Sequence, residues 1–226
     1  MGVMRCDHPD IEDFIDAKRQ PGRLRMFNLS VLVTDAFMQA IQEDASWELS
    51  FGGTVFRSVR ARELWDKIMR AAYEYAEPGM IFIDRVNRMN NLWYCEQISA
   101  TNPCGEIPLP HYGACNLGAI NLTQFVRRPF RVDGDLDMEG IAATAATAVR
   151  LLDNVYDLSH FPLQKQADTA RASRRVGLGL TGLADALAML GIRYGSPESF
   201  TVGEKVMQTI CHGAYRASIE LAREKG

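Results

Sequence analysis

The sequence is organised around Ala100-Thr101-Asn102-Pro103-Cys104-Gly105-Glu106, which places an amide, a thiol and a carboxyl at alternate positions. Alternate side chains of an extended segment point to one face. Pro103 also pushes the residue before it towards extended geometry. We therefore predict a short strand that presents Asn102, Cys104 and Glu106 together to a single small ligand.

A second thiol, Cys115, follows eleven residues after Cys104, within the stretch Gly113–Leu122. Two buried core thiols are the simpler interpretation. Against it stand Asn102 and Glu106, whose polar groups would then need buried partners. A carboxylate near Cys104 disfavours the thiolate form and therefore nucleophilic attack by the sulfur. The pattern favours one-electron chemistry at this thiol.

Composition limits the classes of protein to be considered. The 226 residues, 47% of them apolar, can form one large domain or two small ones. A net charge of −3 gives no basic surface for a nucleic-acid polymer. No apolar run reaches the roughly 20 residues of a membrane span, and the first residues lack the apolar core of a signal peptide. Five cysteines, an odd number, do not suggest a secreted disulfide framework. We expect a cytoplasmic protein.

Short apolar segments alternate with amphipathic ones, which is typical of an α/β fold. The predicted helices are 8–16, 35–42, 61–76, 138–156, 183–190 and 198–225, and the predicted strands are 26–33, 80–84 and 177–180, with a hairpin over 47–56. Residues 84–91 and 127–134 are predicted loops, and 165–175 is a polar segment without a predicted element.

A basic turn covers Lys18 to Arg25 and includes Lys18, Arg19, Gln20 and Arg23. Its composition fits a solvated loop as well as a loop that contacts phosphate or a nucleotide.

Residues 177–182 match the pattern G-x-G-x-x-G, but the dinucleotide interpretation needs a buried strand before the first glycine. The preceding residues 171–176 are polar and basic. We therefore interpret these glycines as allowing a short strand and a helix to pack closely.

Zinc binding is a further alternative, for which the candidate ligands are Cys95, Cys104, His111 and Cys115. Structural zinc sites use closely spaced cysteine pairs, which this sequence lacks, so no metal ligand is assigned. Cysteines 6, 95 and 211 are interpreted as structural, because free cysteine is commonly a small core hydrophobe.

At these motifs the sequence resembles the large catalytic subunit of ribonucleotide reductases. The resemblance extends over essentially the whole chain and is closest to class II, the adenosylcobalamin-dependent enzymes. It rests on Asn102–Glu106, Ala114–Leu122, Arg5–Ile11, Phe27–Val31, Phe82–Asn91 and Arg174–Gly179.

The resemblance implies a ten-stranded α/β barrel of two half-barrels with helices packed outside. Residues 1–226 would be a partial catalytic barrel domain, with flanking N-terminal and C-terminal parts of the enzyme absent. The remaining segments of the enzyme would then be partners of this chain, and the complete enzyme is expected to be a homodimer.

The resemblance also implies roles in reducing ribonucleotides to deoxyribonucleotides for DNA synthesis. Cys104 would carry a thiyl radical, Glu106 would accept the 3′-hydroxyl proton and Asn102 would hold the ribose hydroxyls. Cys115 would be half of a reducing dithiol that passes its disulfide to a thioredoxin-type or glutaredoxin-type reductant. The basic turn falls where the family links a nucleotide effector to the substrate. The adenosylcobalamin site cannot be located in this chain.

The implied partner of Cys115 precedes the segment that matches residues 1–10, and Cys6 matches a different family position. We therefore expect no multi-turnover activity from the isolated chain. Two alternatives stay open: a non-catalytic nucleotide-binding or assembly module of the same fold, and a class I enzyme with a separate radical-generating subunit.

Overall fold

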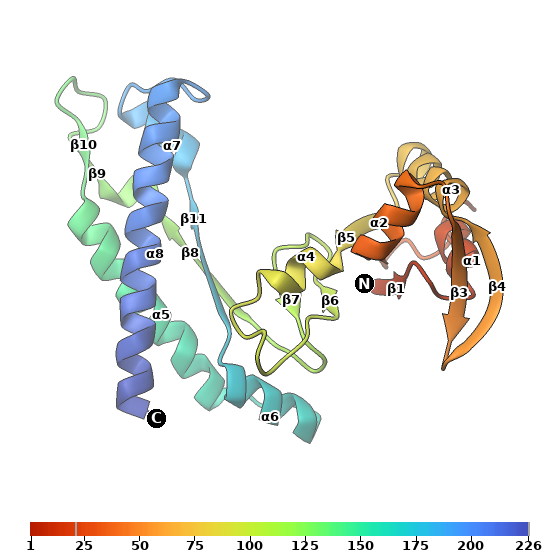
Figure 1. The fold of residues 1–226 in the computed structure, drawn as a ribbon. Coiled ribbons are helices and arrows are strands. Elements are labelled where there is room, and N and C mark those ends of the chain that lie inside the picture. Colours follow the sequence, from red (N-terminus) through yellow and green to blue (C-terminus); the bar gives the residue numbers. More distant parts are fainter. Residues whose placement is uncertain (21, 226) are drawn as a thin grey trace. The chain divides into compact units, whose positions relative to one another are not determined.

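The computed structural model describes residues 1–20 and 22–225, which form two compact units, Met1–His111 and Tyr112–Gly226 (Figure 1). Each unit has its own hydrophobic core. Within the described residues, no helix combines the length and the apolar character that crossing a membrane requires.

The first unit is built on a three-stranded parallel sheet in the order β1-β2-β5. Its strands are β1 (Gly2–Arg5), β2 (Leu29–Val33) and β5 (Gly79–Phe82). All five residues of β2 are buried, as expected for the central strand of a parallel sheet that is covered on both faces. Its helices are α1 (Ile11–Asp16), α2 (Asp35–Gln42), α3 (Ala61–Tyr75) and α4 (Ile83–Arg88).

Helices α2 and α3 and the hairpin between them lie where the sequence predicts them. The Thr34 hydroxyl caps α2 by accepting a hydrogen bond from the Phe37 amide at 3.2 Å. The hairpin consists of β3 (Ser46–Phe51) and β4 (Thr54–Arg60). Its turn uses Gly52 and Gly53, both with positive φ, the geometry that two-residue hairpin loops favour.

Two predictions for the first unit are wrong. The strand predicted from Met26 begins only at Leu29, and Met26 itself is almost fully exposed. The loop predicted over 84–91 begins as α4 instead. Its charges complement the helix dipole, with Asp84 in the first turn and Arg85 and Arg88 in the last, a signal that the sequence contained.

The second unit pairs two parallel strands, β8 (Asn116–Asn121) and β11 (Val176–Thr181), with two long helices. Helices α5 (Met138–Leu158) and α8 (Pro197–Lys225) lie side by side (Figure 1). The shorter elements are the 3₁₀ helix η1 (Leu122–Phe125), β9 (Val126–Arg127), β10 (Asp135–Leu136), α6 (Gln164–Ser173) and α7 (Leu183–Met189). The core combines side chains from β8, α5, α7 and α8.

The polar segment 165–175, for which no element was predicted, largely forms α6. The strand interpretation of the glycine-rich segment is confirmed. A Cβ atom at Gly177 would lie 2.5 Å from a methyl group of Leu117 on the paired strand. Gly182, with φ +73°, makes the turn from β11 into α7. The close contact at Gly177 is thus with the paired strand β8 and not with a helix, and a Cβ atom at Gly179 would meet its nearest neighbour only at 4.0 Å.

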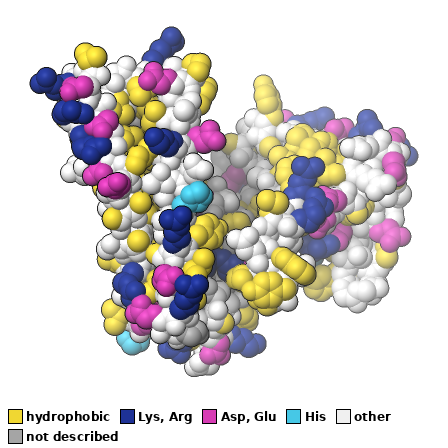
Figure 2. Space-filling model, turned by 60° about the vertical axis from the view of Figure 1, so that its left-hand side comes forward, with side chains coloured by type: hydrophobic (Ala, Val, Ile, Leu, Met, Phe, Trp, Pro, Cys, Tyr) yellow, Lys and Arg dark blue, Asp and Glu magenta, His cyan; other side chains and the backbone are white. Residues whose placement is uncertain are grey.

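The α/β class is confirmed, because both units join parallel strands through segments that contain helices. On the face shown in Figure 2, Lys and Arg side chains are interspersed with Asp and Glu. This mixture agrees with the small net charge of −3.

Candidate functional site

The Asn102–Glu106 segment is the tip of a small hairpin in the first unit. The flanking strands are β6 (Ala100–Thr101) and β7 (Pro108–Leu109), which pair antiparallel. Asn102 to Gly105 form a turn, in which the Gly105 amide donates to the Asn102 carbonyl at 3.1 Å. The prediction of a strand across Asn102–Glu106 is therefore wrong.

Turn chemistry explains the difference from the strand prediction. Asn102, Pro103 and Gly105 occupy turn positions i, i+1 and i+3, which favour Asn, Pro and Gly respectively. Gly105 has φ +84°, a conformation that costs glycine little. Cys104 takes the remaining position, i+2, and its side chain is exposed at the tip of the hairpin.

The turn still brings two of the predicted polar groups together. Asn102 Nδ2 donates to Glu106 Oε1 at 2.5 Å, while Asn102 Oδ1 accepts from the Ile107 amide at 3.0 Å. The asparagine side chain thus links the two ends of the turn that contains Cys104. A thiol, a carboxylate and an amide share one short loop, as the sequence predicts, although a turn places them there.

Ile98, two residues before β6, anchors the hairpin against the rest of the first unit. Ile98 is buried in a small cluster with Leu32 and Ile83. The Ile98 amide donates to Asn87 Oδ1 at 2.7 Å, and Asn87 Nδ2 donates to the Ile98 carbonyl at 3.0 Å. Asn87, at the end of α4, therefore holds the backbone that leads into the turn. The sequence interpretation gave this residue no role of its own.

Cys115 belongs to the second unit and directly precedes β8. Its side chain is half-buried. Burial raises the pKa of the Cys115 thiol, and the nearby Arg175 guanidinium partly opposes this effect. The thiol is therefore mainly protonated at neutral pH, which suits storage of a hydrogen and two-electron reduction with a partner thiol.

The first two basic residues of the turn, Lys18 and Arg19, form ion pairs within the first unit. Lys18 pairs with Glu77, and its side chain is only 13% exposed. Arg19 lies 3.2 Å from Asp16 and 3.6 Å from Glu74. These two residues already have anionic partners, whereas Gln20 and Arg23 are exposed. Pro21, within the same turn, lies outside the described residues.

The remaining cysteines divide by burial. Cys6 is fully buried, as predicted, and burial raises its pKa to about 11. Cys211 is half-buried, whereas Cys95 is exposed, so the core interpretation of Cys95 is wrong. In the described part of the chain, no three His, Cys, Asp or Glu side chains are grouped so that they could hold a metal ion.

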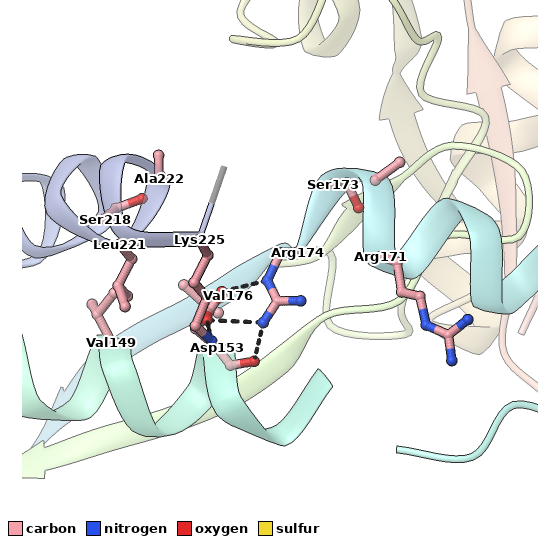
Figure 3. A pocket seen from close by; sticks show the side chains of 11 residues that line it. Val149, Asp153, Arg171, Ser173, Arg174, Val176, Ser218, Leu221, Ala222 and Lys225 are labelled. Atoms are coloured by element: carbon pink, nitrogen blue, oxygen red, sulfur yellow. Dashed lines mark hydrogen bonds and ion pairs between the residues drawn. The ribbon is translucent and has the colours of Figure 1, made fainter. Parts of the chain in front are cut away.

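A charged cluster in the second unit borders a cavity of about 390 Å³. Arg174 donates to both carboxylate oxygens of Asp153 at 2.7 and 2.9 Å, and Lys225 donates to the same carboxylate (Figure 3). Arg174 and Lys225 also pair with Asp157. Because each cation is matched by a carboxylate, the cluster fastens the C-terminal ends of α5 and α8 together. Arg171 points away from it (Figure 3).

Comparisons with known proteins give one matching family model and several similar curated proteins. A family model described as "Ribonucleotide reductase, barrel domain" matches residues 1–226. A protein of Mycobacterium tuberculosis strain H37Rv, named vitamin B12-dependent ribonucleoside-diphosphate reductase, is 42% identical over 229 residues, which is 100% of this chain and 32% of the relative. One of the same name from Thermoplasma acidophilum is 41% identical, covering 100% of this chain and 29% of the relative. A ribonucleoside-diphosphate reductase subunit alpha of Chlamydia muridarum is 29% identical, and the match covers 97% of this chain and 24% of the relative.

Proposed function

Because this chain belongs to the ribonucleotide reductase barrel domain family, we propose that it carries part of an active site that reduces ribonucleotides to deoxyribonucleotides. The chain spans about a third of the length of the curated relatives named vitamin B12-dependent ribonucleoside-diphosphate reductase, 32% in one case. The activity is accordingly proposed for an assembled reductase to which these residues contribute.

The observation that carries the proposal is the Asn102–Glu106 hydrogen bond across the turn that exposes Cys104. The bond fixes a carboxylate and an amide against each other in the same short turn as the thiol. A carboxylate can accept a proton, and an amide can hold neighbouring hydroxyl groups. One ribose presents all the matching groups: a C3′–H bond, a 3′-hydroxyl and a 2′-hydroxyl.

In the proposed reaction, a thiyl radical on Cys104 takes the hydrogen atom from C3′, which forms an S–H bond and leaves a carbon radical. Glu106 accepts the 3′-hydroxyl proton as the C2′–O bond breaks, and the 2′-hydroxyl leaves as water. Asn102 holds the hydroxyls in place. When C3′ recovers its hydrogen atom from Cys104 and O3′ recovers its proton from Glu106, the thiyl radical is regenerated and the carboxylate is restored.

Cys115 is proposed to supply reducing equivalents as one half of a dithiol. Two thiols give up two electrons and two protons as they form a disulfide. One proton leaves in the water molecule, and the other is delivered to the sugar with the electrons. The second thiol would come from another part of the reductase. A thioredoxin-type or glutaredoxin-type protein would then reduce the disulfide and prepare the site for another turnover.

We infer adenosylcobalamin as the radical source, because relatives at 41–42% identity are named vitamin B12-dependent. The relative named ribonucleoside-diphosphate reductase subunit alpha, whose name mentions no vitamin B12, is more distant, at 29% identity. A corrin needs a broad enclosing surface, and the exposed hairpin tip that bears Cys104 does not provide one by itself. The residues around Cys104 therefore do not fit the cofactor alone, and we assign none of them to it.

The finer properties of the enzyme also belong to this proposal. Lys18, Arg19, Gln20 and Arg23 would form part of the loop between a nucleotide effector and the substrate. Because Lys18 and Arg19 are paired with carboxylates, the exposed Gln20 and Arg23 would be the first to meet a nucleotide. A homodimer in the cytoplasm is the expected setting.

The test is Cys104→Ser in the assembled reductase, compared with Cys95→Ser. Both thiols are exposed in the first unit. Cys104→Ser should abolish formation of deoxyribonucleotides while ribonucleotide binding persists, because serine cannot form the sulfur radical. Cys95→Ser should retain turnover. Substantial product formation by Cys104→Ser would refute the radical assignment, as would equal losses in both variants.

A further inference from the structure

Helix α5 holds the chain on both sides of Cys115. Asn116 Nδ2 donates to the Leu152 carbonyl at 3.0 Å, and the Tyr156 hydroxyl lies 2.9 Å from the Ala114 carbonyl. Leu152 and Tyr156 are four residues apart and therefore lie on the same face of α5. The two residues that flank the thiol are thus attached to one rigid element of the second unit.

Tyr156 links a third segment to this arrangement. Its side chain is 1% exposed, and its hydroxyl lies 2.5 Å from the Arg175 carbonyl, just before β11. The Arg175 carbonyl also accepts the Asn116 amide at 3.2 Å. The single phenol proton therefore lies between two carbonyl oxygens, one from each of the segments that become β8 and β11.

We propose that Tyr156 is a positioning residue for the Cys115 thiol. The inference rests on the proposed role of Cys115 as half of a reducing dithiol. Disulfide formation needs the two Cβ atoms about 3.5–4.5 Å apart and a narrow range of torsion angles, so the backbone at Cys115 must stay in place. The buried phenol provides this by tying residue 114 to α5.

The protonation state of Tyr156 suits a permanent donor. Burial, reinforced at high pH by the negative charge of the nearby Cys115 thiolate, raises the pKa of Tyr156 to about 12. The phenol therefore keeps its proton over the whole physiological range. Its role is to hold the backbone, and it exchanges no proton or electron with the substrate.

The experiment measures alkylation of Cys115 in the full chain carrying Tyr156→Phe. Phenylalanine keeps the ring and removes only the hydroxyl. The substitutions Cys95→Ser and Cys104→Ser leave one thiol in the tryptic peptide 89–127, and the peptide 206–216 contains Cys211 alone. Iodoacetamide labelling followed by mass spectrometry then gives separate rates for Cys115 and Cys211.

We expect the ratio of the Cys115 rate to the Cys211 rate to rise about 3- to 10-fold, the change in local opening that loss of one hydrogen bond produces. Cys211 is half-buried in the same unit, so it monitors general loosening. Tyr215→Phe removes a hydroxyl from an exposed tyrosine of α8 and should leave the ratio unchanged. An unchanged ratio in Tyr156→Phe, or parallel increases at both thiols, would overturn the inference.

A kinetic measurement separates this inference from the proposed function. In the assembled reductase, Tyr156→Phe should lower kcat and leave KM for the ribonucleotide unchanged, because the dithiol step and not substrate binding is affected. A raised KM with unchanged kcat would contradict the positioning role. Full turnover by Cys115→Ser would instead contradict the proposed function of Cys115, whatever the alkylation ratio shows.

Discussion

Asn87 and Ile98 are joined by two hydrogen bonds of 2.7 and 3.0 Å, so that one side-chain amide pairs with both backbone groups of a buried residue. The Asn87 side chain thus forms the two hydrogen bonds, one donated and one accepted, that a neighbouring β-strand would otherwise form with Ile98. It closes the loop between α4 and β6 and directs the chain into the turn that carries Cys104. Asn87, which lies before the Asn102–Glu106 segment in the chain, thus fixes the backbone that leads into that segment.

Asn87→Ala should destabilise the first unit by about 1–3 kcal/mol, because it leaves two buried backbone groups of Ile98 without partners. The three tryptophans, at positions 47, 65 and 93, all lie in this unit. Urea unfolding followed by tryptophan fluorescence therefore reports on the first unit alone. Asn91→Ala, which changes an exposed asparagine of the same loop, should leave the midpoint unchanged. A similar shift in both variants would contradict the role given to Asn87.

Glu106→Gln should reduce kcat of the assembled reductase by about 10²- to 10⁴-fold, the usual contribution of a general base. The glutamine oxygen can still accept the hydrogen bond from Asn102, so the turn should keep its shape. Glu63→Gln, at an exposed position of α3, is the matched control and should keep full activity. A Glu106→Gln enzyme with unchanged kcat at neutral pH would exclude the carboxylate as the proton acceptor.

The Asp153 cluster should make the second unit sensitive to acid. Hydrogen bonds from Arg174 lower the pKa of Asp153, and those from Arg174 and Lys225 lower the pKa of Asp157 to about 2. A carboxylate whose pKa is depressed by folding stabilises the folded state above its unfolded pKa, near 4, and loses that contribution as the pH falls towards 2. Stability should therefore decline between about pH 4 and pH 2.

Asp153→Asn should remove part of this pH dependence and destabilise the second unit at pH 7 by about 1–3 kcal/mol, the range for hydrogen bonds to charged groups. The second unit contains no tryptophan and both long helices, so urea unfolding is followed by circular dichroism at about 222 nm. Asp185→Asn, at an exposed position in the first turn of α7, should behave like the unsubstituted chain. Identical acid profiles for Asp153→Asn and the unsubstituted chain would refute the assignment.

Two glycines of α8 should respond in opposite directions to alanine. At Gly213 a Cβ atom would lie 2.9 Å from the Ala142 carbonyl of α5, a backbone atom that cannot move aside alone. Gly213→Ala should therefore separate α5 from α8 and destabilise the second unit by about 1–3 kcal/mol. At Gly203 no atom lies within 4 Å of the added carbon. Gly203→Ala should stabilise the unit by up to about 1 kcal/mol, the difference in helix propensity.

Circular dichroism during thermal or urea unfolding measures both glycine variants under identical conditions. The opposite signs are the informative result, because both substitutions add the same methyl group to the same helix. If Gly213→Ala proved as stable as Gly203→Ala, the close approach of α8 to Ala142 would be wrong.

The sequence by itself determined the family, the α/β class and the long amphipathic helices. The resemblance to the family rests on motifs such as Asn102–Glu106 and Ala114–Leu122. The class and the helices follow from local patterns: apolar periodicity along 61–75 and 138–158, the cap at Thr34 and the paired glycines at 52 and 53. It also selected the loop that joins Asn102, Cys104 and Glu106, because those residue types stand close together in the chain whatever conformation the backbone takes.

Only the tertiary structure decided how those residues are held. The residue types of 102–105 favour a turn, but the pairing of β7 with β6 and the hydrogen bonds between Asn87 and Ile98, which fix where that turn lies, involve residues outside 100–106. Likewise, the hold of Tyr156 on the chain beside Cys115 joins residues 42 positions apart. Contacts between residues so far apart in the chain depend on how whole helices and strands pack. The local sequence pattern therefore indicates the reactive groups, but it does not indicate which residues hold them in place.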